Sequence, residues 1–307
     1  MEKILFGLLI LFNATAFSME SSEVPSGYTE TKYPILMVQG IGGWNDPGYF
    51  NGAVEALTKD GAEVFVANVT PHANTESKAL TLVKDIEDIL ALTGKDKVNI
   101  IAYSIGVIHS RQAASIIPEG VASVTSVGGT NNGTPIGRII ARPNGFYESI
   151  VSTFFTAAGG FFSLLNGASS LVPYDPNAAF EGLDPDVAKQ FNQENPWGYE
   201  SHCDPTLKTE SLASNGIHYF SWGGAGLFTN ILDPSSLYTF WASTMIPEEN
   251  DGIVSRCSSH LGKVIKDDYH MDHLDLVNGM LGLVSSSEVS PLTLFRQHAN
   301  RLQLLGL

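Results

Sequence analysis

Short apolar runs alternate with helix-like segments in the first half of the chain. Runs rich in β-forming residues and bounded by turn residues predict buried strands, whereas apolar residues three or four apart predict helices. The predicted strands are residues 34–38, 62–69, 98–102 and 121–127. The predicted helices are residues 50–60, 77–93 and 105–117, which end at Gly61, Gly94 and Pro118. Strands that alternate with helices predict an α/β fold, with a mostly parallel sheet and helices on both faces.

The alternation stops after residue 130. Residues 130–215 contain few strand signals but many aromatic residues. We therefore expect a helical insertion at about 130–215, which either packs on the core or acts as a lid whose apolar face meets lipid. Strand signals return at residues 219–222, and a last helix is predicted over residues 292–302.

The first 18 residues have the pattern of a signal peptide. Lys3 precedes an unbroken apolar run, residues 4–12, and small residues suited to cleavage follow at Ala16 and Ser18. The run is too short for a transmembrane helix, which takes about 20 apolar residues. We therefore expect an exported protein of residues 19–307 that is secreted and is not an integral membrane protein.

The balance of charged residues limits the kinds of molecule that the protein is expected to bind. Lys and Arg number 17 against 32 Asp and Glu, which gives a net charge of −15. Nucleic-acid binding requires cations that neutralise phosphates, so this composition argues against a nucleic-acid partner. Because an acidic surface also repels anionic membranes, an interfacial enzyme with this composition would depend on apolar contact.

The chain has two cysteines, Cys203 and Cys257. In an oxidising compartment an even pair favours one disulfide over two buried thiols. Closing so long a loop would stabilise the fold by about 3–4 kcal/mol.

A serine lies where a predicted strand turns into a predicted helix, in Ala102-Tyr103-Ser104-Ile105-Gly106. A nucleophile elbow needs small residues two positions before and two after its serine, and Ala102 and Gly106 meet that limit. The N-terminus of the following helix favours negative charge, which makes the N–H of Ile105 an oxyanion donor. The alternative is an ordinary serine at a helix N-terminus.

A glycine-rich loop, Gln39-Gly40-Ile41-Gly42-Gly43, follows the first strong strand. In a hydrolase such a loop supplies the second oxyanion amide, here that of Ile41. A phosphate-binding loop is the rival interpretation, but the full G-x-G-x-x-G dinucleotide pattern is absent.

The general base is less easily assigned. A hydrolase with this serine takes its acid and then its histidine from later in the chain. His109 follows the elbow on its helix, and His298 is expected on the surface of the last helix. The remaining candidates are His260, His270 and His273 as the base, with Asp251 or Asp275 as the acid. Spacing alone does not choose among them.

Several segments resemble the bacterial true lipases of the Pseudomonas–Burkholderia type. The most specific are Arg296-Gln297-His298-Ala299-Asn300-Arg301-Leu302, and Asp251-Gly252 with Cys257-Ser258-Ser259-His260-Leu261-Gly262. The similarity runs in order over nearly all of residues 19–307 and is weakest in the expected lid. It implies a single α/β-hydrolase domain with no organic cofactor.

Residue by residue, the resemblance implies a nucleophile, an acid, a base and a metal site. Ser104, Asp251 and His273 would form the catalytic triad, with the backbone amides of Ile41 and Ile105 as the oxyanion hole. Cys203 would pair with Cys257. A structural calcium would bind the carboxylates of Asp233 and Asp275 and the carbonyl of Leu283, since Ca²⁺ prefers oxygen ligands. Lipases of this type often require a dedicated foldase, which is a further expected partner.

Three positions depart from the family pattern. The His-Gly pair of the oxyanion loop is Gln39-Gly40, and the Gly-His-Ser-His-Gly elbow is Ala102-Tyr103-Ser104-Ile105-Gly106. Gly279 stands where the family has a glutamine that helps to bind calcium, so we expect weaker calcium binding.

The sequence therefore predicts a secreted triacylglycerol lipase that acts on lipid esters at an interface. The alternatives are a phospholipase or soluble-ester esterase and, in a different class, a lipid-binding homologue with impaired catalysis.

Overall fold

The computed structural model describes residues 27–41, 47–69, 74–141, 181–199, 210–279 and 282–307. The predicted signal peptide, Cys203 and most of the expected lid lie outside these residues. None of the described helices combines the length and apolar character needed to cross a bilayer.

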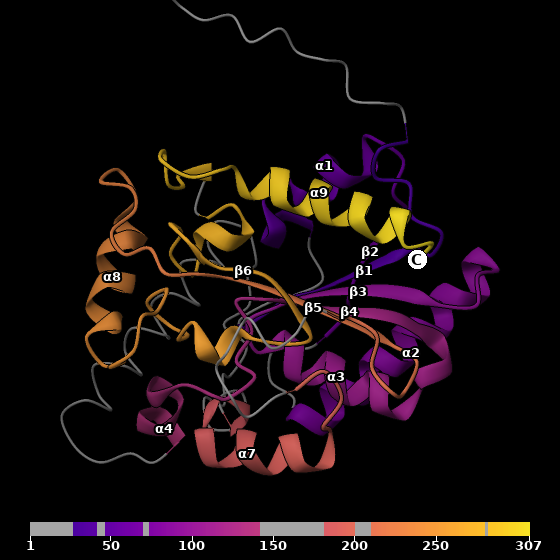
Figure 1. The fold of residues 1–307 in the computed structure, drawn as a ribbon, viewed down its shortest axis with the longest axis horizontal. Coiled ribbons are helices and arrows are strands. Elements are labelled where there is room, and N and C mark those ends of the chain that lie inside the picture. Colours follow the sequence, from indigo (N-terminus) through magenta and orange to yellow (C-terminus); the bar gives the residue numbers. More distant parts are fainter. Residues whose placement is uncertain (1–26, 42–46, 70–73, 142–180, 200–209, 280–281) are drawn as a thin grey trace, which may run out of the picture.

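A six-stranded parallel sheet forms the centre of the fold (Figure 1), as the alternating pattern predicted. The strand order is β2-β1-β3-β4-β5-β6, so β3 and β4 lie in the middle. The strands are β1 (Ile35–Val38), β2 (Val64–Val66), β3 (Val98–Tyr103), β4 (Val121–Val127), β5 (His218–Gly224) and β6 (Lys263–Tyr269).

Helices cover both faces of this sheet. In Figure 1, α1 (Ala53–Thr58) and α9 (Pro291–Leu304) lie above it, and α2 (Thr75–Thr93) and α3 (Gly106–Ile116) lie below it. Strand β3 is buried on both sides because successive side chains point to opposite faces. Ile100 and Ala102 belong to the core between the sheet and α2 and α3. Ile101 and Tyr103 belong to the core between the sheet and α1 and α9.

Local signals at the ends of α2 explain its length. The side chain of Asn74 accepts a hydrogen bond from the N–H of Ser77 at 2.9 Å, which starts the helix two residues before the predicted position. Gly94 ends it in a left-handed conformation, φ 66°, with its N–H donating to Leu90 O. The predicted end is confirmed.

Two described elements escaped prediction, β6 and α8 (Pro234–Ser243), whereas α7 (Pro185–Glu194) is a helix within the insertion expected at about 130–215. Strand β6 reads Lys-Val-Ile-Lys-Asp-Asp-Tyr and lies at the sheet edge, so it lacks the apolar run typical of an inner strand. The two helices begin alike: an aspartate, Asp184 or Asp233, caps each N-terminus and a proline follows it. The other described elements are α4 (Pro135–Ala141), η1 (Pro47–Phe50), η2 (Pro118–Gly120), η3 (Glu181–Leu183), η4 (Cys257–Ser259) and η5 (Asp275–Val277).

The described parts of the expected insertion pack on the core through Arg111 of α3. Its guanidinium is buried and donates to the side chains of Asn131 and Asn192 and to the carbonyl of Asn195. A buried cation needs such partners, because an unpaired charge away from water is costly. Arg111 therefore fixes α7 against α3.

His298 lies in the core, which corrects the expectation that it lies on the surface. Its Nε2 is 2.7 Å from Thr125 Oγ1, and its Nδ1 is 3.0 Å from the guanidinium of Arg301. Because a guanidinium can only donate, Nδ1 accepts and Nε2 carries the proton. Burial, followed by the charge of Arg301, lowers the pKa of His298 well below its usual value. The α9 pattern hid this because a histidine among polar residues resembles a solvated face.

We predict that His298 makes stability fall in acid. The unfolded chain protonates this imidazole below about pH 6.5 while the folded chain does not, so folding becomes less favourable as pH falls. The free energy of unfolding, measured in urea between about pH 6.5 and 5, should depend less on pH in His298→Gln than in the parent. The difference in slope should approach about 1.4 kcal/mol per pH unit. Equal slopes in the two proteins would contradict the buried neutral imidazole.

Candidate active site

The predicted site residues come from loops that follow different strands of the sheet. Ser104 directly follows β3, Asp251 lies between β5 and β6, and His273 lies four residues after β6. The carboxyl ends of parallel strands meet at one edge of a sheet, where this type of fold builds its sites. The fold thus brings together residues 169 positions apart in the chain.

Ser104 occupies a strained turn. Its φ is 55°, a left-handed conformation that non-glycine residues rarely adopt, and its N–H donates to Val127 O at 3.0 Å. Close backbone contacts surround the turn. A Cβ on Gly106 would lie 2.4 Å from Gln39 O, and one on Gly40 would lie 2.9 Å from the Cβ of Ser104. The glycine two positions after the serine, and Gly40 of the adjacent loop, therefore follow from a direct steric limit.

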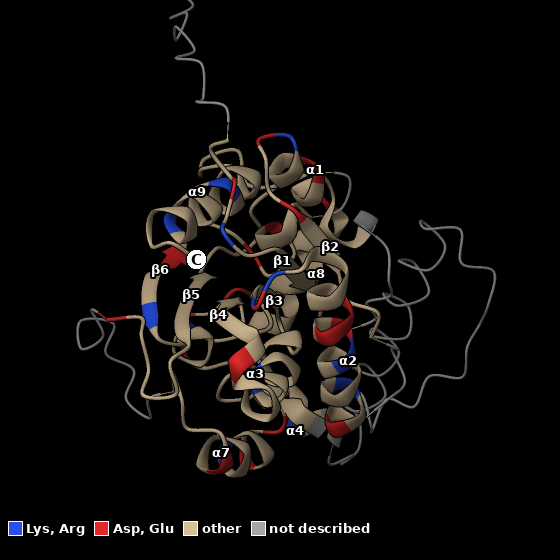
Figure 2. Ribbon diagram, turned by 90° about the vertical axis from the view of Figure 1, so that its right-hand side faces the viewer, with Lys and Arg blue, Asp and Glu red and all other residues tan. Residues whose placement is uncertain are grey.

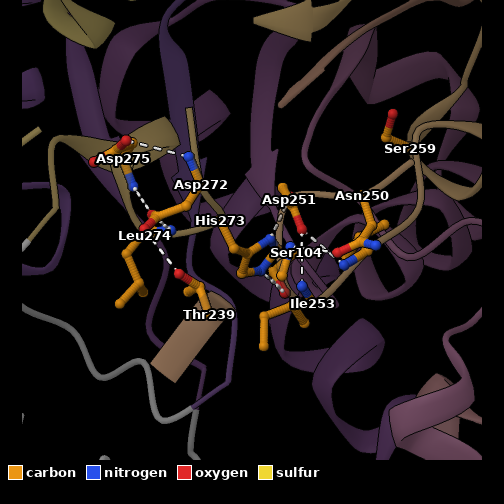
Figure 3. Close-up of polar contacts among 12 residues, drawn as sticks. Ser104, Thr239, Asn250, Asp251, Ile253, Ser259, Asp272, His273, Leu274 and Asp275 are labelled. Carbon is orange, nitrogen blue, oxygen red and sulfur yellow. Dashed lines mark hydrogen bonds and ion pairs between the residues drawn. The ribbon is translucent and has the colours of Figure 1, made fainter. Parts of the chain in front are cut away.

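Ser104, His273 and Asp251 form one hydrogen-bonded line (Figure 3). His273 Nε2 is 3.0 Å from Ser104 Oγ, and its Nδ1 is 2.8 Å from Asp251 Oδ2. An ionised carboxylate only accepts, so Nδ1 carries the proton and Nε2 offers its lone pair to the serine hydroxyl. All three residues are at most 5% exposed, which strengthens the polar contacts between them.

Further hydrogen bonds hold the acid and the imidazole in place. Asp251 Oδ1 accepts from the backbone N–H groups of Ile253 and Val254, at 3.0 and 2.7 Å. The N–H of His273 donates to Asp251 O, and the Tyr103 hydroxyl donates to His273 O, both at 2.8 Å. The Tyr103 ring also lies 4.9 Å from the imidazole. Contacts of both the ring and the backbone of His273 therefore fix the orientation of the imidazole.

The other candidate histidines do not join this line. His260 Nε2 lies 2.8 Å from Asp267 Oδ2, and His270 is exposed. His109 is buried in α3, where desolvation and then the charge of Lys78 lower its pKa well below the usual value. Within the described residues, His273 is the histidine that contacts Ser104.

Two backbone amides near Ser104 are candidates for the oxyanion hole. Ile105 is the N-cap of α3, and no described residue accepts a hydrogen bond from its N–H or from that of Ile41. The Tyr49 hydroxyl holds the glycine-rich loop after β1 in place. It accepts a hydrogen bond from the N–H of Gly40 at 3.2 Å and lies 3.4 Å from the carbonyl oxygen of Ile41. Gln39, which replaces the family's histidine, donates to Ala67 O at 3.0 Å and so ties the loop to the segment after β2.

A cluster of buried carboxylates lies beside His273. Asp233, Asp272 and Asp275 each offer an oxygen within 4.8 Å of the others. Asp233 Oδ2 and Asp275 Oδ1 are buried without a hydrogen-bond partner among the described residues. Such orphaned carboxylate oxygens are costly unless a cation or a proton neutralises them.

A backbone carbonyl faces the same space. A Cβ built on Gly279 would lie 3.3 Å from Leu283 O and 3.8 Å from Asp275 Oδ1. The carbonyl of Gly279 itself accepts from the side chain of Asn51 at 3.1 Å. Burial and then the charge of Asp272 raise the pKa of Asp275 to about 7. Two orphaned carboxylate oxygens and a carbonyl are the donors that a hard cation such as Ca²⁺ prefers, so these residues fit the expected ion.

Asp272 is the member of this cluster that the sequence interpretation missed. Its Oδ2 accepts from the hydroxyls of Ser236 and Thr239 in α8, and its Oδ1 accepts from the N–H groups of Leu274 and Asp275 (Figure 3). Its position next to His273 in Met-Asp-His-Leu-Asp was the available signal.

Cys257 lies in η4 and is disulfide-bonded. The other cysteine of the chain, Cys203, lies outside the described residues, so the pairing stays a prediction.

Residues 33–275 match the family of the alpha/beta hydrolase fold. The sequence is 40% identical over 307 residues to a triacylglycerol lipase of Vibrio cholerae, with 97% of each chain covered. A triacylglycerol lipase of Pseudomonas fragi is 35% identical, with 90% of this chain and 98% of the relative covered. One of Burkholderia plantarii is 29% identical, over 91% of this chain and 88% of the relative.

Solved structures agree with the fold. The mature lipase BlEst2 of Bacillus licheniformis superposes with a TM-score of 0.59 at 18% identity, covering 81% of this chain and 88% of that one. A metagenomic carboxyl esterase, MGS0156, superposes with a TM-score of 0.60 at 13% identity, covering 93% and 80%.

We predict that Gly106→Ala disables the serine turn. Its Cβ would meet the backbone oxygen of Gln39, so α3 and the loop after β1 must move apart and Ser104 must leave its alignment. Phosphonylation of Ser104 by a fluorophosphonate should slow at least about tenfold, the effect of a loss of about 1.4 kcal/mol in transition-state stabilisation. Gly94→Ala is the control, because no atom lies within 4 Å of its Cβ and its cost is the local strain of a positive φ at the end of α2, a strain that Gly106 does not have. Equal labelling rates for the two variants would refute the steric argument.

Proposed function

The chain belongs to the α/β-hydrolase family, and from this premise we propose that it is a serine ester hydrolase that cleaves triacylglycerols. The observation that carries the proposal is the buried line from Ser104 Oγ through the imidazole of His273 to Asp251. Names of its relatives support the substrate class, since three of them are called triacylglycerol lipase.

In the proposed reaction, Ser104 Oγ attacks the ester carbonyl carbon while His273 Nε2 takes the hydroxyl proton. The carbonyl oxygen becomes an oxyanion, and the N–H groups of Ile105 and Ile41 would donate to it. His273 then gives its proton to the departing alkoxide, which leaves an acyl group on Ser104. Water, activated by the same imidazole, releases the fatty acid. Asp251 stays ionised and stabilises the imidazolium.

The departures from the family pattern do not remove a reacting atom. Both proposed oxyanion donors are backbone groups, which any residue except proline provides. The side chains that replace the family's histidines have structural contacts of their own: Tyr103 donates to His273 O, and Gln39 donates to Ala67 O. These contacts favour a working enzyme over the alternative of a lipid-binding homologue with impaired catalysis.

We further propose that Asp233, Asp275 and the carbonyl of Leu283 hold a structural Ca²⁺. The cation would neutralise the buried carboxylates and fix the segment that carries His273. Asp233 also caps α8, since its Oδ1 accepts from the N–H and the hydroxyl of Ser235. The carboxylates thus connect α8 to the loop of the general base.

Export belongs to the same proposal. The apolar run of residues 4–12 would direct secretion, and a Cys203–Cys257 bridge would form in the oxidising compartment. Dependence on a foldase stays a prediction.

Turnover of a soluble ester tests the nucleophile. We expect kcat for Ser104→Ala, and for Asp251→Asn, which favours the wrong imidazole tautomer, to fall by at least about 10⁴-fold. Ser115→Ala, on α3 and away from the imidazole, should retain the parent rate. Initial rates on a short-chain ester, and on a triacylglycerol beside a phospholipid, measure both the mechanism and the preferred substrate. Equal rates for Ser104→Ala and the parent would refute the assignment.

Thermal unfolding tests the cation. We expect the midpoint to be higher with calcium than with chelator, because binding to the folded state at about 100-fold above Kd stabilises by about 2.7 kcal/mol. Asp233→Asn should lose most of this calcium-dependent shift. Asp268→Asn, which alters an exposed carboxylate on β6, should keep it. Identical midpoints with and without calcium in the parent would exclude the site.

A further inference from the structure

Helix α8 has its polarity inverted. Its buried residues are small or carry hydroxyls: Ser235, Ser236, Thr239, Ala242 and Ser243. Its exposed face instead carries Leu237, which is 63% exposed, and Phe240, which is 48% exposed. A surface helix of a soluble protein normally buries its large apolar side chains. The cause lies beneath the helix, where the hydroxyls of Ser236 and Thr239 donate to the carboxylate of Asp272.

The loop before α8 extends the same surface. Ile231 and Leu232 are 80% and 73% exposed, and the ring of Phe228 packs edge-on against that of Phe240 at 6.5 Å. Phe228 has φ 53°, a conformation that is costly for a bulky residue and persists where the surroundings impose it. Exposed apolar side chains gathered in this way mark an interaction site. We call Phe228, Ile231, Leu232, Leu237 and Phe240 the α8 surface.

The α8 surface lacks charge in a strongly acidic protein. Between residues 211 and 247 the sequence has a single Asp, Glu, Lys or Arg, namely Asp233, and it is 1% exposed. Helix α8 has no charged residue, whereas α2 and α7 carry several, seen in red and blue in Figure 2. Although the net charge is −15, this part of the described surface can approach an uncharged apolar phase without burying a charge of its own.

The α8 surface is also continuous with the proposed active site. Tyr238 and Trp241, on the side of α8 that turns inward, pack against an apolar cluster that contains Ile105. Ile41, the other proposed oxyanion residue, packs against the same cluster. In addition, a Cβ built on Gly252, the neighbour of Asp251, would lie 2.5 Å from the Cβ of Thr239, so α8 packs closely against this loop. Apolar side chains therefore lead from the exposed face of α8 to the place where an ester carbonyl would bind.

We propose that the α8 surface docks on the surface of an uncharged lipid aggregate and so places the active site against its insoluble substrate. The inference rests on the proposed lipase function, because a water-insoluble ester is what such a surface would meet. Amphipathic helices bind lipid by burying their apolar face at the boundary with water. Here the contacts of Ser236 and Thr239 with Asp272 hold that face outward and join it to the residue before His273.

Binding of an inactive protein to vesicles tests the proposal. In a Ser104→Ala background, the full chain is mixed with phosphatidylcholine vesicles that contain trioleoylglycerol, and the bound fraction is measured by flotation. The triple variant Ile231→Ser, Leu232→Ser, Leu237→Ser should lower the partition coefficient at least about 100-fold, because each buried apolar side chain contributes about tenfold. A matched control, Leu80→Ser, Leu92→Ser, Leu304→Ser, alters three comparably exposed leucines on α2 and α9 and should bind as the parent does.

Enzyme with Ser104 intact separates this inference from the proposed function. The triple variant should hydrolyse a monomeric short-chain ester within about twofold of the parent rate but lose at least about tenfold on emulsified trioleoylglycerol. Absence of monomeric-ester turnover in the parent would defeat the proposed function, whereas the flotation result would still stand or fall by itself. The inference is overturned if the triple variant floats like the parent, or if the parent binds only anionic vesicles. It is also overturned if sedimentation shows that the triple substitution instead dissociates a dimer of this chain.

Discussion

The arrangement of the site depends on one strained residue. Ser104 is held at a positive φ between β3, which is buried on both faces, and α3, which packs against the neighbouring loop without space for a Cβ at Gly106. A left-handed serine costs free energy that the central strand and the helix must offset, and both elements lie deep in the fold. The rest of the site is built around the hydroxyl that this turn exposes. Its partners, Asp251 and His273, come from the loops before and after β6 and are held in place by hydrogen bonds of their own.

The buried carboxylates near the imidazole differ in how they are satisfied. Asp251 accepts hydrogen bonds from two backbone N–H groups and from His273, so its charge needs no further partner. Asp272 is also fully engaged, by two hydroxyls and two N–H groups. Asp233 and Asp275 each retain an orphaned oxygen among the described contacts. An aspartate surrounded by hydrogen-bond donors therefore serves as a fixed anion, whereas a nearby aspartate with an oxygen that lacks a donor is suited to bind a cation.

The sequence predicted the elements whose burial is uniform and missed those whose environment is mixed. Strands β1, β3 and β4 are buried along their length and rich in apolar and β-branched residues because both faces are covered, and such runs are readable without a structure. Edge strand β6 mixes charged and apolar residues without regular alternation, so its pattern alone does not distinguish it from a loop. At the site, residue types identified the elbow serine, but choosing His273 over His260 or His270 required a family resemblance. Contacts from distant segments decide which imidazole is oriented, and a single sequence does not contain them.

The apolar pattern of helix α8 predicts the wrong buried face. In Pro-Ser-Ser-Leu-Tyr-Thr-Phe-Trp-Ala-Ser the apolar residues Leu237 and Phe240 lie three positions apart, and the usual inference places that face in the core. The inference assumes that the core is apolar. Beneath α8 it is a carboxylate, Asp272, which is stable when buried only if hydroxyls and amides surround it. The hydroxyl face must therefore turn inward, and Leu237 and Phe240 are left outside. One buried charge thus decides which way the helix faces, and the same charge joins the outward apolar surface to the loop of His273.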